Sequence, residues 1–133
     1  MNRIVLGGAQ LGLPYGILNG GETLSREEVA RILDTAVDHG IDSIDTAIAY
    51  GQSESIIGET SQNRFNIISK LPPLPVDISN VSEWVHSQVQ GSLSRLKCTS
   101  LEALLLHRPQ DLTGAQGAEL YAAIGSLMAE KMI

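Results

Sequence analysis

Four short apolar runs, each followed by a segment with a helical pattern, constrain the fold of this chain more than any other feature. The runs lie at residues 3–8, 43–47, 65–69 and 101–106. The helical patterns cover about residues 25–39, 53–57, 81–96 and 115–132. Strands buried on both faces are short continuous apolar runs, and parallel strands require crossover connections. The alternation therefore predicts a parallel α/β fold.

The clearest helix signal begins at Ser25. Ser25 and Glu28 have the spacing of a capping box, in which each side chain accepts a hydrogen bond from the other residue's backbone. Gly40 suits the left-handed conformation that often ends a helix. The preceding segment, residues 9–23, contains Pro14 and several glycines, which predicts a long loop. The apolar stripe of this helix comprises Val29, Ile32, Leu33, Ala36 and Val37.

The remaining helices have weaker boundaries. The helix that begins at residue 53 or 54 is expected to stop near Gly58. The inner face of helix 81–96 is expected to comprise Val85, Val89, Leu93 and Leu96. The last helix is expected to bury Leu120, Ile124, Leu127 and Met128.

Length, charge and cysteine content indicate the number of domains and argue against several classes of function. The chain has 133 residues, of which 43% are hydrophobic, so residues 1–133 are expected to form a single domain with its own core. A net charge of −6 argues against binding to nucleic acid or to an anionic membrane. The single cysteine, Cys98, has no partner for an internal disulfide, and we find no signal peptide and no apolar span of ~18 residues. We therefore expect a cytoplasmic protein.

Four polar side chains follow the predicted strands. Asp45 ends the second strand and Tyr50 follows it, Lys70 ends the third, and His107 follows the fourth. Because the carboxyl ends of parallel strands share one edge, these residues are expected to meet in one pocket. Each one alone also has an ordinary structural explanation, such as a loop cap or a packed ring. Four coincident placements favour a functional site.

This set of residues suits proton transfer. A phenol has a pKa of ~10, so it is a poor acid near neutrality unless a neighbouring group stabilises its anion. Lys70 could do this for Tyr50, Asp45 could hold Lys70 charged, and His107 could bind a substrate oxygen. Reduction of a carbonyl group also requires a hydride, which side chains do not supply. This interpretation therefore requires a nicotinamide cofactor.

Several short motifs occur in an order typical of one protein family. They are His39-Gly40-Ile41, Ile44-Asp45-Thr46-Ala47, Tyr50-Gly51, Ser53-Glu54, Ile57-Gly58, Ile68-Ser69-Lys70, Ser92-Leu93-Ser94-Arg95-Leu96 and Leu104-Leu105-Leu106-His107-Arg108-Pro109. Together they resemble the N-terminal half of an aldo-keto reductase. The resemblance implies four βα units equivalent to the first half of a TIM (β/α)8 barrel.

The resemblance also implies a function. It implies NADP(H)-dependent reduction of a small-molecule aldehyde or ketone, with NAD as a possible substitute. The catalytic residues are then Asp45, Tyr50 as the acid, Lys70 and His107. Gly8, Ala9 and Gln10 are expected to lie near the nicotinamide, together with Asp45.

The barrel is incomplete in this chain. By the resemblance, most residues that bind the cofactor belong to the second half of the barrel, so the 133-residue chain is expected to be inactive alone. A half barrel leaves strand edges unpaired. The chain is therefore expected either to come from a longer protein or to pair with another copy through these edges.

Three alternatives differ in class. The chain could be a non-catalytic half-barrel fragment or a self-assembling module. It could be a lyase in which Lys70 forms a Schiff base with a carbonyl substrate. A metal hydrolase is the weakest alternative, because the spacing of His39, His86 and His107 is not that of a ligand set, and no metal site is predicted.

Overall fold

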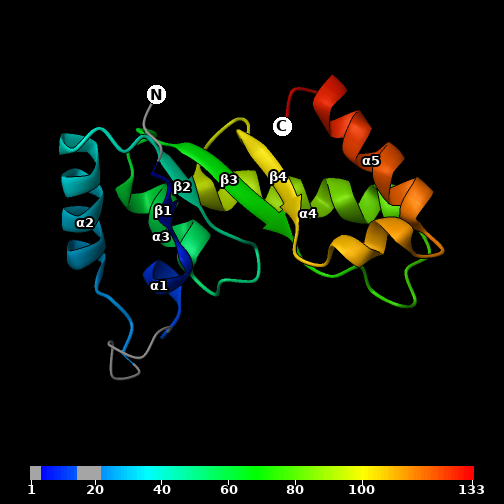
Figure 1. Cartoon of the computed structure of the whole chain (residues 1–133), viewed down its shortest axis with the longest axis horizontal. Coiled ribbons are helices and arrows are strands. Elements are labelled where there is room, and N and C mark those ends of the chain that lie inside the picture. The colour runs from blue at the N-terminus through cyan, green and yellow to red at the C-terminus, as the bar shows by residue number, and fades with distance from the viewer. Residues whose placement is uncertain (1–3, 15–21) are drawn as a thin grey trace.

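The computed structural model describes residues 4–14 and 22–133 (Figure 1). Strands and helices alternate along these residues. The strands are β1 (Leu6–Gly7), β2 (Ser43–Asp45), β3 (Asn66–Leu71) and β4 (Ala103–Leu106). The helices are α1 (Ala9–Gly12), α2 (Arg26–Asp38), α3 (Ser53–Thr60), α4 (Val81–Leu96), the 3-10 helix η2 (Pro109–Thr113) and α5 (Gly117–Ala129).

The strands form one parallel sheet in the order β1-β2-β3-β4. Its register places Leu6 opposite Ile44, Ile44 opposite Ile67, and Ile68 opposite Ala103. All three pairings are parallel, so the carboxyl ends of the strands lie at the same edge of the sheet. The predicted α/β fold of four βα units is confirmed.

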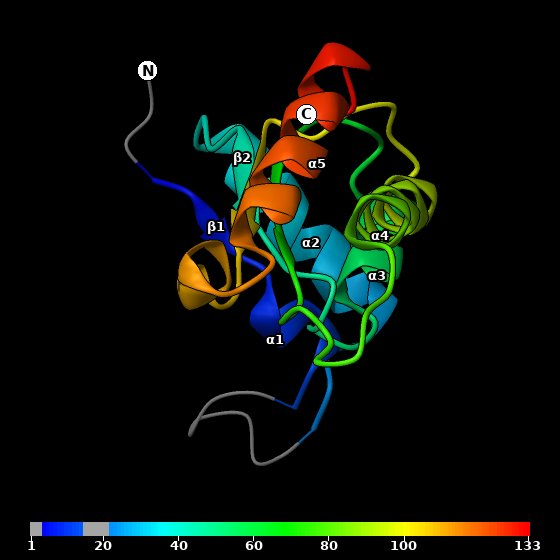
Figure 2. The same cartoon turned by 90° about the vertical axis from the view of Figure 1, so that its right-hand side faces the viewer.

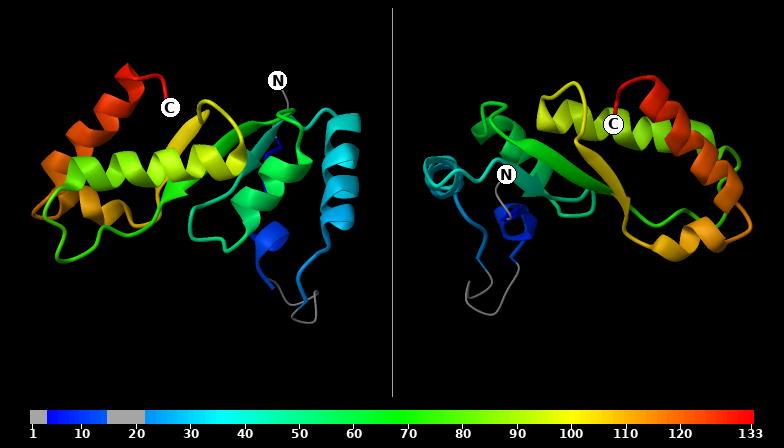
Figure 3. Two further views of the ribbon diagram at one scale, coloured as in Figure 1. Left: turned by 180° about the vertical axis from the view of Figure 1, so that it is seen from behind. Right: turned by 45° about the horizontal axis from the view of Figure 1, so that its top comes forward.

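The larger helices cover one face of the sheet. Helix α2 contacts α3, α3 contacts α4, and α4 contacts α5. The view from behind shows α3 and α4 in front of the strands, with α2 beside them (Figures 2 and 3). Burial alternates along β3 accordingly: Ile67, Ser69 and Leu71 are buried under the helices, whereas Ile68 and Lys70 on the other face are half-buried. The expectation of strands buried on both faces is therefore wrong, because helices cover only one face.

Local sequence patterns correctly predicted the ends of α2 and α4. The Ser25 backbone amide donates to Glu28 Oε2 at 2.8 Å, and the Glu28 amide donates to Ser25 Oγ at 3.2 Å, which confirms the capping box. Gly40 follows α2 with a φ of 73°, as predicted for a left-handed cap. Helix α4 covers the predicted residues, and the four apolar side chains of its predicted inner face are buried. None of the helices in the described ranges has the length and apolar character needed to cross a bilayer.

The N-terminal segment differs from the prediction. Only Leu6 and Gly7 form β1, and Ile4 and Val5 are 58% and 46% exposed, because few elements pack around this end of the sheet. The segment expected to be a loop contains the single-turn helix α1. The rest of that segment falls partly on residues 15–21, which lie outside the described residues, as does Arg3.

Two helices differ from the prediction in their packing. Gly58 does not end α3, which continues to Thr60. Instead, a Cβ atom at Gly58 would lie 2.1 Å from the Arg95 carbonyl oxygen of α4, so this glycine permits close helix contact. Helix α5 is shorter than the predicted 115–132. Its Leu120 and Leu127 are buried as expected, but Ile124 is only half-buried and Met128 is 64% exposed, since it lies about a quarter of a turn beyond Leu127.

Candidate active site

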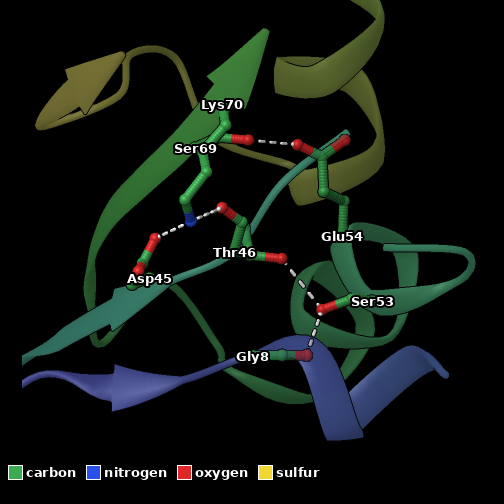
Figure 4. Close-up of polar contacts among 7 residues, drawn as sticks. All are labelled: Gly8, Asp45, Thr46, Ser53, Glu54, Ser69 and Lys70. Atoms are coloured by element: carbon green, nitrogen blue, oxygen red, sulfur yellow. Dashed lines mark hydrogen bonds and ion pairs between the residues drawn. The ribbon is translucent and has the colours of Figure 1, made fainter. Parts of the chain in front are cut away.

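The site begins with an ion pair between two neighbouring strands. Lys70 of β3 donates from Nζ to Asp45 Oδ1 at the end of β2, and also to the Thr46 carbonyl oxygen at 2.8 Å (Figure 4). The Lys70 side chain is 16% exposed, whereas that of Asp45 is 41% exposed. The cation is thus held by two acceptors from β2 and its continuation, and part of the carboxylate remains accessible to solvent.

Two aromatic rings lie beside this ion pair. Lys70 Nζ is 5.2 Å from the centroid of the Tyr50 ring, and the Tyr50 and His107 ring centroids are 5.8 Å apart with an interplanar angle of 87°. The first contact is in the range of a cation–π interaction and the second has edge-to-face geometry. All four residues that the sequence predicted to meet are therefore brought together.

Backbone hydrogen bonds position these rings. The Tyr50 amide donates to the Ala47 carbonyl oxygen at 3.0 Å, and the Tyr50 carbonyl accepts from the Ser53 amide at 3.0 Å, which fixes the turn between β2 and α3. The intervening Gly51 has a φ of 56°, a conformation that glycine adopts readily. His107 donates its amide to the Leu71 carbonyl oxygen at 3.0 Å, so it directly extends the pairing of β3 with β4.

The segment predicted to lie near a cofactor joins the same edge. The Gly8 amide donates to the Asp45 carbonyl oxygen at 2.7 Å, which places the start of α1 beside the end of β2. Gly8 is buried, Ala9 is half-buried and Gln10 is exposed. The exposed Gln10 and the accessible part of Asp45 leave polar groups at this edge for a ligand.

A buried carboxylate lies on the opposite face of the sheet, and the sequence did not reveal its role. Glu54 of α3 is 2% exposed and accepts from Ser69 Oγ at 2.7 Å and from Ser92 Oγ at 2.6 Å. Arg95 of α4 also donates to it, from Nε at 2.9 Å and Nη2 at 2.7 Å. The signal was the position of Ser92, a polar residue on the inner stripe of α4 next to Leu93.

A second buried network precedes it by one residue. Ser53 Oγ donates to the Gly8 carbonyl oxygen at 2.8 Å and lies 2.9 Å from Thr46 Oγ1 (Figure 4). Because a hydroxyl has one proton, the Thr46 hydroxyl is the donor in the second contact. These bonds tie the ends of β1 and β2 to the start of α3.

No group of three or more histidine, cysteine, aspartate or glutamate side chains in the described part of the chain is arranged to hold a metal ion.

Comparison with known proteins assigns the family. The model of the aldo/keto reductase family matches residues 3–130. The chain belongs to this family. D-arabinose 1-dehydrogenase from Saccharomyces cerevisiae is 32% identical over 116 residues, which are 80% of this chain and 33% of the yeast protein. The 6-dehydroglucose reductase of Novosphingobium aromaticivorans is 30% identical over 102 residues, 64% of this chain and 33% of that protein.

Solved structures of aldo-keto reductases share the fold of this chain. A Pseudomonas aeruginosa protein assigned to the aldo-keto reductases has a TM-score of 0.79 and 29% identity, and the match covers 96% of this chain and 51% of that one. An aldo-keto reductase from Bacillus halodurans has a TM-score of 0.73 at 21% identity, which shows the shared fold. The chain therefore spans about half of these structures and about a third of the curated relatives.

Proposed function

We propose that this chain carries the proton-transfer residues of an NADP(H)-dependent oxidoreductase that reduces an aldehyde or ketone to an alcohol. The observation that carries the proposal is the cluster at the carboxyl edge of the sheet, where Lys70 Nζ contacts Asp45 and lies 5.2 Å from the centroid of the Tyr50 ring. Membership of a family of oxidoreductases supports it.

In this proposal Tyr50 donates the proton to the substrate oxygen. The developing phenolate is stabilised by the Lys70 ammonium, which Asp45 and the Thr46 carbonyl hold in place. His107 is exposed and its ring meets Tyr50 at 87°, so it lies where it can donate a hydrogen bond to the same substrate oxygen. The substrate carbonyl would therefore bind between the two rings.

The cofactor would lie against the start of α1. Gly8, Ala9, Gln10 and Asp45 would contact the nicotinamide, since Gly8 is bonded to Asp45 and both Gln10 and part of the Asp45 carboxylate are accessible. When bound, NADPH supplies the hydride that reduces the carbonyl carbon. NADH is the alternative hydride donor, because the same nicotinamide ring carries the hydride in both cofactors.

The names of relatives suggest a class of substrate. Two relatives are named as a D-arabinose dehydrogenase and a 6-dehydroglucose reductase, and a human relative, 31% identical over 102 residues, as an aflatoxin B1 aldehyde reductase. These substrates are sugars or aldehydes. We therefore propose a small aldose or other aldehyde as the substrate.

The decisive variant is Tyr50→Phe, which retains the ring beside Lys70 and His107 and removes the proton. We expect the rate of NADPH consumption with D-arabinose, glyceraldehyde or benzaldehyde to fall by about 10²–10⁴-fold, with cofactor binding unchanged. The assay uses the protein as its source cell produces it. Tyr121→Phe is the matched control, because Tyr121 lies on α5 and is 75% exposed.

Wild-type turnover in Tyr50→Phe would overturn the assignment. The Schiff-base alternative makes a different prediction, because borohydride would then trap the substrate covalently on Lys70. Mass spectrometry of the borohydride-treated protein separates the two reactions.

The exposed edges of the sheet lead to a second part of the proposal. Val5 beside β1 and Leu105 on β4 are each 46% exposed, and β1 and β4 are the outer strands of the sheet in the described residues. Unpaired edges readily accept further strands. We propose that the rest of a longer chain or a second copy covers them, and that the 133 residues alone do not turn over.

Intact mass and sedimentation of the protein from its source cell test this extension. A mass above 14.2 kDa indicates a longer chain, and a dimer of 14.2-kDa subunits indicates a second copy. A folded 14.2-kDa monomer would contradict both.

A further inference from the structure

Two consecutive residues of β3 serve opposite faces of the sheet. Side chains alternate along a strand, so Ser69 points into the helical layer and Lys70 points toward Asp45 (Figure 4). Ser69 is fully buried, whereas the Lys70 side chain is 16% exposed. Any force that fixes Ser69 therefore also fixes the backbone from which the Lys70 side chain extends.

Glu54 holds the Ser69 side chain from the helical side of the sheet. Its Oε1 accepts from both Ser69 and Ser92, and its Oε2 accepts from Arg95. These donors come from β3 and α4, while Glu54 itself belongs to the first turn of α3. A buried carboxylate with donors on both oxygens has little freedom to rotate, so Ser69 is held against a rigid acceptor.

Ser53, the residue before Glu54, contacts Thr46, whose carbonyl group receives the Lys70 ammonium. The Ser53 hydroxyl accepts from the Thr46 hydroxyl at 2.9 Å, and the Thr46 carbonyl accepts from Lys70 Nζ at 2.8 Å. One turn of α3 thus holds both the strand that carries Lys70 and the carbonyl group that receives its ammonium.

We infer that Glu54 and Ser53 are positioning residues for the Lys70 ammonium, Glu54 acting through Ser69 and Ser53 acting through Thr46. Neither residue touches the reacting atoms, because both lie on the helical side of the sheet. The catalytic consequence of this inference rests on the proposed function of Lys70, whereas the geometric consequence does not.

Ser69→Ala and Ser92→Ala form a matched pair that separates positioning from stability. Both serines are fully buried, and their Oγ atoms donate to the same Glu54 Oε1, at 2.7 Å and 2.6 Å. Each variant therefore removes one hydroxyl from the same carboxylate. Only Ser69 is covalently next to Lys70.

The first readout is the acetylation rate of Lys70 by N-hydroxysuccinimidyl acetate in the folded, cofactor-free protein, followed by peptide mass spectrometry. We expect Ser69→Ala to raise this rate about threefold to tenfold, the factor equivalent to one hydrogen bond. The second readout is carbonyl reduction, in which kcat should fall by a similar factor while KM for the aldehyde stays the same. Ser92→Ala should change neither, although both variants should melt at lower temperature.

Equal effects of the two variants on Lys70 acetylation and on kcat would overturn the inference and leave a purely structural network. If acetylation separates the variants but neither Ser69→Ala nor Tyr50→Phe alters turnover, the inference stands and the proposed function fails. Ser53→Ala tests the same inference from the Thr46 side, so the test survives if Ser69→Ala does not fold. It should also raise Lys70 acetylation.

Discussion

The molecule contains two carboxylate–cation pairs on opposite faces of one sheet. Glu54 pairs with Arg95 beneath the helices, where its side chain is 2% exposed and two serine hydroxyls complete its hydrogen bonds. Asp45 pairs with Lys70 at the carboxyl edge, where 41% of its side chain is exposed. The pairs have the same chemistry, but only Asp45 can still meet a ligand.

The difference in exposure indicates that the buried pair contributes mainly to stability, whereas the exposed pair is available for the proposed activity. A buried carboxylate must be satisfied by protein groups, because an unpaired charge in the interior is costly. A partly exposed carboxylate makes a smaller contribution to folding and keeps surface for a cofactor or substrate. Substitutions in the buried pair should therefore affect stability most, and substitutions in the exposed pair should affect activity most.

The largest expected effect is on activity, in Lys70→Met. Without the ammonium beside Tyr50, we expect carbonyl reduction to fall by about 10²–10⁴-fold. The free energy of unfolding should change by only about 1 kcal/mol or less, since the lost partner, Asp45, is accessible to water. Steady-state kinetics and urea unfolding of the same preparation check both statements. A large loss of stability would remove the contrast between the two pairs.

Arg95→Ala should show the opposite pattern. It leaves Glu54 buried without its cation, so the free energy of unfolding should fall by about 3 kcal/mol. Turnover of the remaining folded protein should fall by no more than about tenfold, because Glu54 Oε2 loses its donors while Ser69 still donates to Oε1. Arg64→Ala is a matched control: Arg64 pairs with Asp34 at 2.8 Å, but the Asp34 side chain is 61% exposed, so the loss should be about 1 kcal/mol or less.

Gly58→Ala should weaken the buried pair indirectly. The added Cβ would lie 2.1 Å from the Arg95 carbonyl oxygen and would push α3 away from α4. We expect a loss of about 1–3 kcal/mol in urea unfolding, as for other overpacked contacts. Gly125→Ala in α5 has no atom within 4 Å of the new Cβ and should instead be neutral or stabilising. Similar losses in both variants would contradict a specific α3–α4 contact.

The smallest effect concerns a third carboxylate, which is fully exposed. Hydrogen bonds from the Ser25 backbone and hydroxyl lower the pKa of Glu28 below its usual value. Its ionised form therefore stabilises the fold above the usual carboxyl pKa, and this contribution disappears as the pH falls through the lowered value. Glu28→Gln should reduce the melting temperature slightly at neutral pH and not at all in strong acid. Thermal melting across this pH range measures the difference.

The sequence predicted the exposed site better than the buried one. Asp45, Tyr50, Lys70 and His107 could be placed together because parallel topology alone puts the ends of their strands at one edge. The start of α2 at Ser25 followed from a local hydrogen-bonding rule. These inferences needed only the order of elements or a few neighbouring residues.

The buried network depends on contacts between distant segments. Ser69 and Ser92 are ordinary strand and helix residues until Glu54 is known to lie between them. Glycine often ends a helix, so Gly58 is expected to do so. Only the approach of α4 shows that Gly58 is there because a side chain would not fit. Val5 is as apolar as a core residue, yet it is 46% exposed because burial depends on which elements pack against it.

The sheet order also has a consequence for how the protein is made. Each strand pairs with the strand that precedes it in the chain, so every element that leaves the ribosome finds its partner already synthesised. The sheet can therefore grow by one strand at a time, and the residues of the candidate site are synthesised in the order Asp45, Tyr50, Lys70 and His107.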